Sequence, residues 1–87
     1  MSFEIVWSDR AIEQTHVFNK SIAKRIIKKI QGIKDYPEHF LETLENTKFF
    51  KLRVGKYRVI VDLKRKEEII KIIYIEKRSK IYKRFPI

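Results

Sequence analysis

Four cationic side chains lie within the stretch KLRVGKYRVIVD, which runs from Lys51 to Asp62. The central Gly55-Lys56 pair predicts a tight type II′ turn between two strands, and this turn sets a register that places Arg53 opposite Arg58. Like charges opposed across strands cost roughly 0.2 to 1 kcal/mol per pair, so the arrangement suggests that a negative partner is missing from the sequence. A phosphate between the two guanidinium groups would relieve the repulsion, because each can bind phosphate oxygens in a bidentate fork.

The alternation of side chains along these two strands predicts two different faces. The apolar face is expected to meet helices and comprises Phe50, Leu52, Val54, Tyr57, Val59, Val61 and Leu63. The other face is expected to remain open and carries Phe49, Lys51, Arg53, Arg58, Ile60 and Asp62. Because rigid strands hold its cations, the open face is the predicted binding surface.

The positive charge of the chain is confined to its C-terminal part. Residues 1–47 hold seven Lys or Arg and seven Asp or Glu, whereas residues 48–87 hold fourteen and four, so the second part carries the whole net charge of +10. A composition generally rich in lysine explains many of these cations but not their one-sided distribution. The asymmetry indicates a polyanionic or strongly acidic partner.

Periodicity predicts an α+β fold for a single domain of residues 1–87. A helical hairpin is expected to pack on one face of a small, mainly antiparallel sheet, with a short C-terminal tail or helical turn. Residues 69–77 are apolar on both faces, so this strand is expected to be central. The expected elements, in chain order, are a strand over 2–7, a helix from the Ser8 cap to about Phe18, a helix over Lys20–Asp35, a polar connector over 38–47, and strands over Lys48–Val54, Tyr57–Leu63 and Ile69–Lys77.

Several kinds of site are absent from the sequence. The chain has no cysteine and only two glycines, and it contains no metal-ligand motif and no glycine-rich phosphate loop. We therefore expect no metal and no cofactor.

The sequence also shows no charged leader before an apolar run and no apolar stretch of about 18 residues, so we expect a soluble, cytoplasmic protein with no membrane contact.

A spaced pattern in the second half of the chain resembles a known family. Leu44, the KLRVGKYRVIVD stretch, the Ile-rich strand and the later KRSKIY stretch resemble the RelE branch of the RelE/ParE toxin superfamily. The resemblance implies a RelE-like fold and a metal-independent endoribonuclease that cuts mRNA in the ribosomal A site. In that reaction a ribose 2′-OH attacks the adjacent phosphate, and the 5′-oxygen leaves. The implied partners are the ribosome, mRNA and a RelB-like antitoxin with an acidic amphipathic segment.

The resemblance also implies roles for individual residues. Lys51 matches the position of a general base or electrostatic stabiliser, and Arg58 matches the residue that binds the scissile phosphate. Arg78 matches the residue that stabilises the developing charge, and Tyr82 matches the residue that orients the substrate base. The residues expected to contact RNA are Lys48, Arg53, Lys56, Lys77 and Lys80. The chain departs from common family patterns by carrying Phe49 before the KLR sequence and Glu76-Lys77 before Arg78.

Two alternatives share most of these features. A ParE-like toxin would have the same fold but would inhibit DNA gyrase without nuclease chemistry. A non-catalytic RNA-binding module would use the cations only for phosphate contacts, and its affinity would fall steeply with salt. His16 and His39 are the only histidines, and both are expected to be structural or surface residues.

Overall fold

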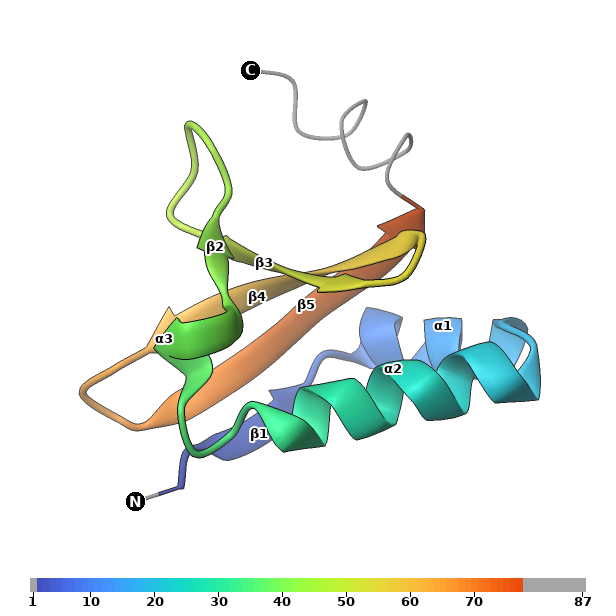
Figure 1. Ribbon diagram of the computed structural model, residues 1–87, viewed down its shortest axis with the longest axis horizontal. Coiled ribbons are helices and arrows are strands. Elements are labelled where there is room, and N and C mark those ends of the chain that lie inside the picture. Colours follow the sequence, from blue (N-terminus) through green and yellow to red (C-terminus); the bar gives the residue numbers. More distant parts are fainter. Residues whose placement is uncertain (1, 78–87) are drawn as a thin grey trace.

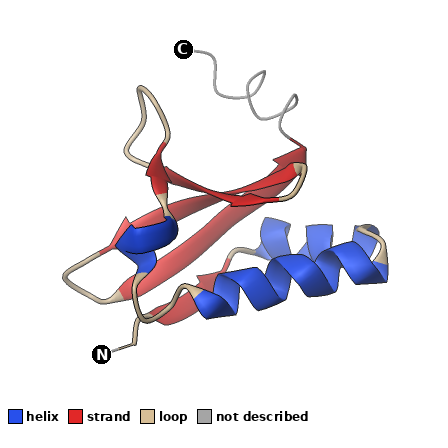
Figure 2. Ribbon diagram, viewed as in Figure 1, coloured by secondary structure: helices blue, strands red, loops and turns tan. Residues whose placement is uncertain are grey.

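The computed structural model describes residues 2–77. Figure 1 shows a twisted sheet with the two longer helices side by side along one of its faces. Figure 2 distinguishes helices from strands by colour and shows the two longer helices together on one side of the strands. The elements are β1 (Glu4–Trp7), α1 (Asp9–Val17), α2 (Lys20–Gly32), α3 (Pro37–Phe40), β2 (Glu42–Thr43), β3 (Phe50–Val54), β4 (Tyr57–Lys64) and β5 (Ile69–Lys77).

The strand order in the sheet is β1-β5-β4-β3-β2. Strand β1 pairs with β5 in parallel, and the other three pairings are antiparallel. The predicted α+β fold with a helical hairpin on a mainly antiparallel sheet is therefore confirmed. The central place of β5 is confirmed as well, since it lies between β1 and β4.

The β3–β4 hairpin has the predicted register. Val54 pairs with Tyr57 and Arg53 pairs with Arg58. Gly55 has a φ of 59°, and Lys56 is not among the residues with positive φ, which fits a type II′ turn and excludes type I′. The apolar face of the hairpin packs on the helices as expected, with Leu52 and Val59 in the main core.

Helix α2 contributes its isoleucine stripe to this core. Ile26 and Ile30 are fully buried between the helix and the sheet, as the period of 3.6 residues predicts. The helix ends at Gly32, before the expected end at Asp35. Its last turn is tight, because the Ile33 N–H bonds to the Ile30 carbonyl three residues back.

No helix within residues 2–77 is both long and apolar enough to cross a bilayer.

The prediction of a plain polar connector over residues 38–47 is wrong. This segment forms all of α3 except Pro37 and also the short edge strand β2, and it buries Leu41 and Leu44. Leu44 forms a second, small core with Ile60, against which Phe49 and Ile73 pack. The face expected to be open is therefore partly covered, because two leucines in a polar stretch have apolar partners on the sheet.

Polar side chains at and near the start of helix α1 form hydrogen bonds with the part of β5 that β1 does not reach. Strand β1 pairs with β5 only from Ile69 to Ile72. Beyond that point the Ser8 Oγ donates to the Ile73 carbonyl at 2.6 Å, and the Gln14 side-chain amide binds both backbone groups of Ile75, accepting from its N–H at 2.7 Å and donating to its carbonyl. Polar side chains of the helix therefore replace a neighbouring strand.

Replacing Gln14 with alanine should destabilise the protein. The substitution leaves the Ile75 N–H and carbonyl without these partners in a partly buried position, which costs about 1 to 3 kcal/mol for an unsatisfied group. Urea unfolding of Gln14→Ala measures the loss. Glu13→Ala is the control, because Glu13 is an exposed neighbour on the same helix and should change stability by less than about 0.5 kcal/mol. Equal losses in both variants would contradict this role for Gln14.

Candidate nucleic-acid interface

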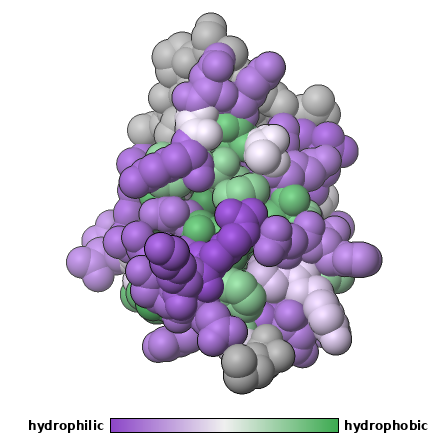
Figure 3. Space-filling view, turned by 90° about the vertical axis from the view of Figure 1, so that its left-hand side faces the viewer, coloured by the Kyte–Doolittle hydropathy of each residue, from purple (hydrophilic) through white to green (hydrophobic). Residues whose placement is uncertain are grey.

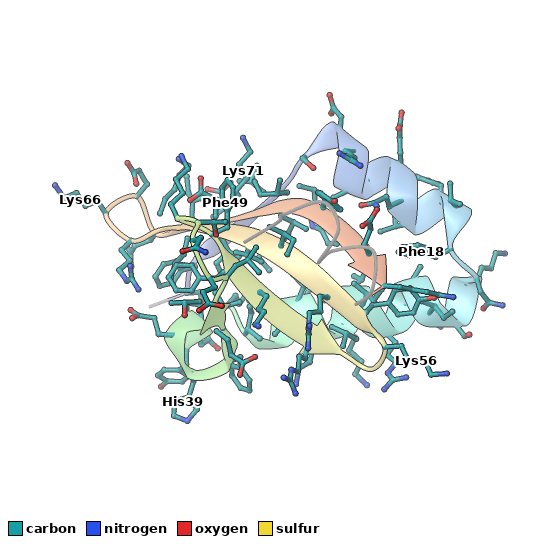
Figure 4. The ribbon with its side chains drawn as sticks, turned by 90° about the horizontal axis from the view of Figure 1, so that it is seen from above. Phe18, His39, Phe49, Lys56, Lys66 and Lys71 are labelled. Carbon is teal, nitrogen blue, oxygen red and sulfur yellow. The ribbon has the colours of Figure 1, made fainter. Side chains whose placement is uncertain are left out.

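Strands β3 and β4 place three of the predicted site residues on one face. Lys51 lies opposite Ile60, and Arg53 lies opposite Arg58, so alternation gives all three cations the same side of the sheet. Their environments differ: Arg53 is exposed, Lys51 is half-buried, and Arg58 is only 3% exposed. Figure 4 views the molecule from above, with Lys56 and Lys66 at the turns that flank the two ends of β4.

The two opposed arginines have acidic residues on neighbouring strands, but only Arg53 forms an ion pair with one of them among the described residues. Arg53 Nε lies 3.5 Å from Glu42 Oε1 on the neighbouring strand β2. Arg58 lies directly opposite Glu76 on β5. Edge strand β2 therefore supplies an acid beside Arg53, and a phosphate between the two arginines stays a prediction.

A β-bulge brings Glu76 to the face that carries Arg58. Ile72 pairs with Val61 and belongs to the helix-side core, but Tyr74 pairs with Ile60 on the other face. The register shift at Ile60/Val61 leaves Ile73 as an extra residue in β5. Strict alternation from Ile72 would have placed Glu76 toward the helices, so the bulge reverses the direction of this side chain.

Glu76 belongs to a buried polar group that reaches helix α1. Glu76 is 8% exposed, and the Tyr74 hydroxyl donates to its Oε2 at a long 3.4 Å. The Arg10 guanidinium carbon lies 4.2 Å from the centre of the Tyr74 ring, within cation–π range. In the part of the chain that the structure describes, every buried side-chain nitrogen or oxygen has a hydrogen-bond partner. Sequence reasoning missed Tyr74 and Arg10, although a glutamate in a strand this apolar is a signal in itself.

The other residues predicted to bind RNA are spread over two regions. Lys48 is exposed in the loop before β3, where its Nζ lies 5.6 Å from the centre of the Phe49 ring. Lys56 and Lys77 are both exposed and line one cavity of about 530 Å³ beside the hairpin turn. Arg78, Lys80 and Tyr82 lie outside the described residues. Lys56 and Lys77 are thus brought together, and they are separate from the Lys48 loop.

A cationic groove between α2 and the hairpin was not predicted. Two cavities of about 550 and 530 Å³ share Arg25, Val54 and Gly55 in their walls. Lys28 and Lys29 extend this positive lining along the helix, and no carboxylate is found among the described residues that line either cavity. The helix pattern alone gives no sign of this groove, because only the fold brings Arg25 to the hairpin turn at Gly55.

The other surfaces of the described residues show no further group of side chains that suggests a site. His16 and His39 are both exposed, as expected for surface residues. Residues 2–77 contain no group of three His, Cys, Asp or Glu that could hold a metal ion. The end of the molecule formed by α3 and the β4–β5 turn is mainly hydrophilic, with only small apolar areas between its polar side chains (Figure 3).

A family model describing the ParE toxin of the type II toxin–antitoxin system parDE matches residues 5–82. The chain belongs to this toxin family. The resemblance to the RelE/ParE superfamily is thereby confirmed, and the protein is the toxin of a toxin–antitoxin system. No curated protein sequence matches the chain.

Solved structures of RelE-type toxins share the fold. A RelBE toxin–antitoxin complex from Mycobacterium tuberculosis is similar with a TM-score of 0.81 at 16% identity, covering 90% of this chain and 100% of the other. An archaeal RelE–RelB complex from Pyrococcus horikoshii gives 0.76 at 23% identity, covering 92% and 99%. A YoeB dimer from Staphylococcus aureus gives 0.71 at 19% identity, covering 90% and 99%. The toxin therefore has the fold of RelE toxins.

The two glycines of the toxin should respond to alanine with opposite signs. Gly55 has a φ of 59°, and an added Cβ would lie 3.1 Å from Arg25 Nη2, so Gly55→Ala should cost about 1 to 2 kcal/mol of stability. Gly32 ends α2 with nothing within 4 Å of an added Cβ, and Gly32→Ala should gain up to about 1 kcal/mol. Thermal unfolding of both variants checks the signs, and a stabilised Gly55→Ala would contradict the strained turn.

Proposed function

We propose that this toxin is a ribosome-dependent, metal-independent endoribonuclease that cleaves mRNA in the ribosomal A site. The observation that supports it best is the confirmed register of the β3–β4 hairpin, which gives Lys51, Arg53 and Arg58 one common face. A phosphorane-like transition state carries extra negative charge, and cations fixed on rigid strands stabilise such charge with little reorganisation. The cytoplasm, which holds ribosomes and mRNA, is the proposed location.

The proposed reaction needs no group beyond these side chains and the RNA. A base takes the proton of a ribose 2′-OH, and the 2′-oxygen attacks the adjacent phosphorus. The bond to the 5′-oxygen breaks, and this oxygen takes up a proton as it leaves, so that one fragment ends in a 2′,3′-cyclic phosphate and the other begins with a 5′-hydroxyl. We assign Lys51 as the general base or electrostatic stabiliser and Arg58 as the phosphate ligand. Arg78 stabilises the developing charge, and Tyr82 orients the base. Lys48, Arg53, Lys56, Lys77 and Lys80 contact the RNA backbone.

A ParE-like toxin that binds DNA gyrase without cleaving RNA is the second candidate. The burial of Arg58 beside Glu76 favours it, because a phosphate ligand needs an accessible guanidinium. The name of the matching family model favours it too. A non-catalytic RNA-binding module is the third candidate, in which the same cations only hold phosphates.

A cognate RelB-like antitoxin is the proposed protein partner. Similar folds have been solved as RelE–RelB complexes. The groove beside Arg25 supports an acidic, amphipathic segment as the binding element, since cations surround an apolar floor that includes Ile26 and Val54. Opposite charges of this kind accelerate association by electrostatic steering.

Primer extension on an mRNA incubated with the toxin, with and without translating ribosomes, tests the proposed reaction. The wild type should produce cuts only with ribosomes, and Lys51→Ala and Arg78→Ala should each lower the rate by about 100-fold or more, the typical loss for a group that stabilises transition-state charge. Lys66→Ala is the control, because it removes the same charge in the β4–β5 turn, at the other end of β4 from the hairpin turn (Figure 4).

Intact RNA in every lane with a folded wild-type protein would contradict the nuclease. Inhibition of gyrase supercoiling under the same conditions would then support the second candidate. RNA binding with a steep salt dependence and no cleavage would support the third.

A further inference from the structure

We propose that β3 binds an extended segment of a partner protein as an added antiparallel strand, at the free edge formed by Arg53 beside the cationic groove. Acidic and apolar residues alternate in this segment. The inference deepens the proposed antitoxin partner and rests on it for the identity of the protein that supplies the segment. Three observations carry the binding mode: the free strand edge, the composition of the groove, and the contacts that β2 makes at the same edge.

The short strand β2 pairs with only the first part of β3 (Figure 1). The pairing reaches Lys51 but not Arg53. Backbone groups of successive strand residues point alternately to the two neighbouring strands, and the Phe49 carbonyl points to the β2 side, where it accepts from the Leu44 N–H. The Arg53 N–H and carbonyl therefore point to that side too, and within residues 2–77 they form no backbone hydrogen bond there. A further strand can bind at this position.

The groove beside this edge combines an apolar floor with a cationic rim. Its cavity of about 550 Å³ is lined by Arg53 of β3, by the buried Ile33 and by the exposed ring of Phe40. The cations of α2 that line it are Arg25, Lys28 and Lys29. Because none of the described residues that line this cavity is acidic, charge complementarity favours a segment that is negatively charged and carries apolar side chains.

Strand β2 shows where an acidic residue on a neighbour of β3 is placed. Glu42 pairs with Lys51, and its Oε1 lies 3.5 Å from Arg53 Nε. Residues opposed across two strands share a face of the sheet, so the residue of an added strand opposite Arg53 lies on the open face with these cations. An acidic residue fits this position. Its two neighbours along the strand point to the helix side, where the apolar floor favours aliphatic side chains.

An added strand also affects the proposed RNA surface. Arg53 is one of the residues proposed to contact RNA, and its side chain is 62% exposed. An acidic residue opposite Arg53 forms an ion pair with it and brings negative charge to the face that also carries Lys51. RNA and the added strand therefore exclude each other at this end of the hairpin, and a partner that binds here inhibits the toxin.

A synthetic peptide tests strand addition. The probe is a short fluorescein-labelled peptide of alternating glutamate and valine, and fluorescence anisotropy measures its affinity for the full-length toxin. In the added strand the glutamates, one of them opposite Arg53, direct their N–H groups to β3, whereas the valines direct theirs to solvent. Methylation of the glutamate nitrogens should weaken binding by about tenfold or more, since it removes hydrogen bonds to β3. Methylation of the valine nitrogens is the matched control and should change the affinity by less than about threefold.

Two exposed arginines of the toxin provide a second comparison. Arg53 and Arg65 each form an ion pair with one exposed glutamate of the chain, and their side chains are 62% and 54% exposed. Arg53→Ala should weaken binding of the peptide by about three- to fivefold, which corresponds to the loss of one exposed ion pair. Arg65→Ala removes the same kind of side chain from the β4–β5 turn and should leave the affinity unchanged.

Three results would overturn the proposal. Equal losses after methylation of the glutamates and of the valines would show that the backbone of the peptide does not pair with β3. Equal affinities of Arg53→Ala and Arg65→Ala would place the peptide elsewhere on the toxin. Binding of a short RNA that is weakened by Arg25→Ala, with no binding of the peptide, would assign the groove to nucleic acid.

Cleavage distinguishes this inference from the proposed function. Binding of the peptide with the expected effect of methylation, but with no cleavage of mRNA on ribosomes, would support the added strand and reject the nuclease. Ribosome-dependent cleavage by the wild type, with no binding of the peptide, would support the nuclease and reject the added strand.

Discussion

The antiparallel ladder between β4 and β5 is the interaction on which the other features of this toxin depend. It places Val59 and Val61 against the helices, and its bulge sends Glu76 to the opposite face, beside Arg58. Because β1 covers only the first part of β5, the remaining edge requires Ser8 and Gln14 of the helical segment as partners. The position of α1 and the direction of the Glu76 side chain therefore follow from the same strand.

The fold was largely predictable because its signals are local. Alternation in the hairpin, the Gly55-Lys56 turn and the isoleucine stripe of α2 each specify one element and one buried face. The bounds of β5 agree with the prediction, and so does its central position. The β2 segment escaped prediction because two strand residues and two separate leucines are too short a pattern to detect.

The direction of the Glu76 side chain could not be predicted for a physical reason. Strand β5 is apolar on both faces, so its sequence carries no alternation from which a bulge, and hence the direction of Glu76, could be inferred. The opposed arginines were correctly placed, but the acid that pairs with Arg53 lies on β2, a strand that was not predicted. The Arg25 groove was missed for a similar reason, since it forms only when α2 packs beside the hairpin turn.

NMR of the arginine side chains during titration with a short RNA that carries 2′-O-methyl riboses, and therefore cannot undergo 2′-OH attack, tests the central claim most directly, that RNA phosphates bind the sheet face that carries Lys51 and Arg53. We expect the Nε–H signal of the exposed Arg53 to shift at lower RNA concentration than the signal of Arg25, which lies in the groove beside α2. A shift confined to Arg25, with Arg53 unchanged at saturation, would contradict this claim.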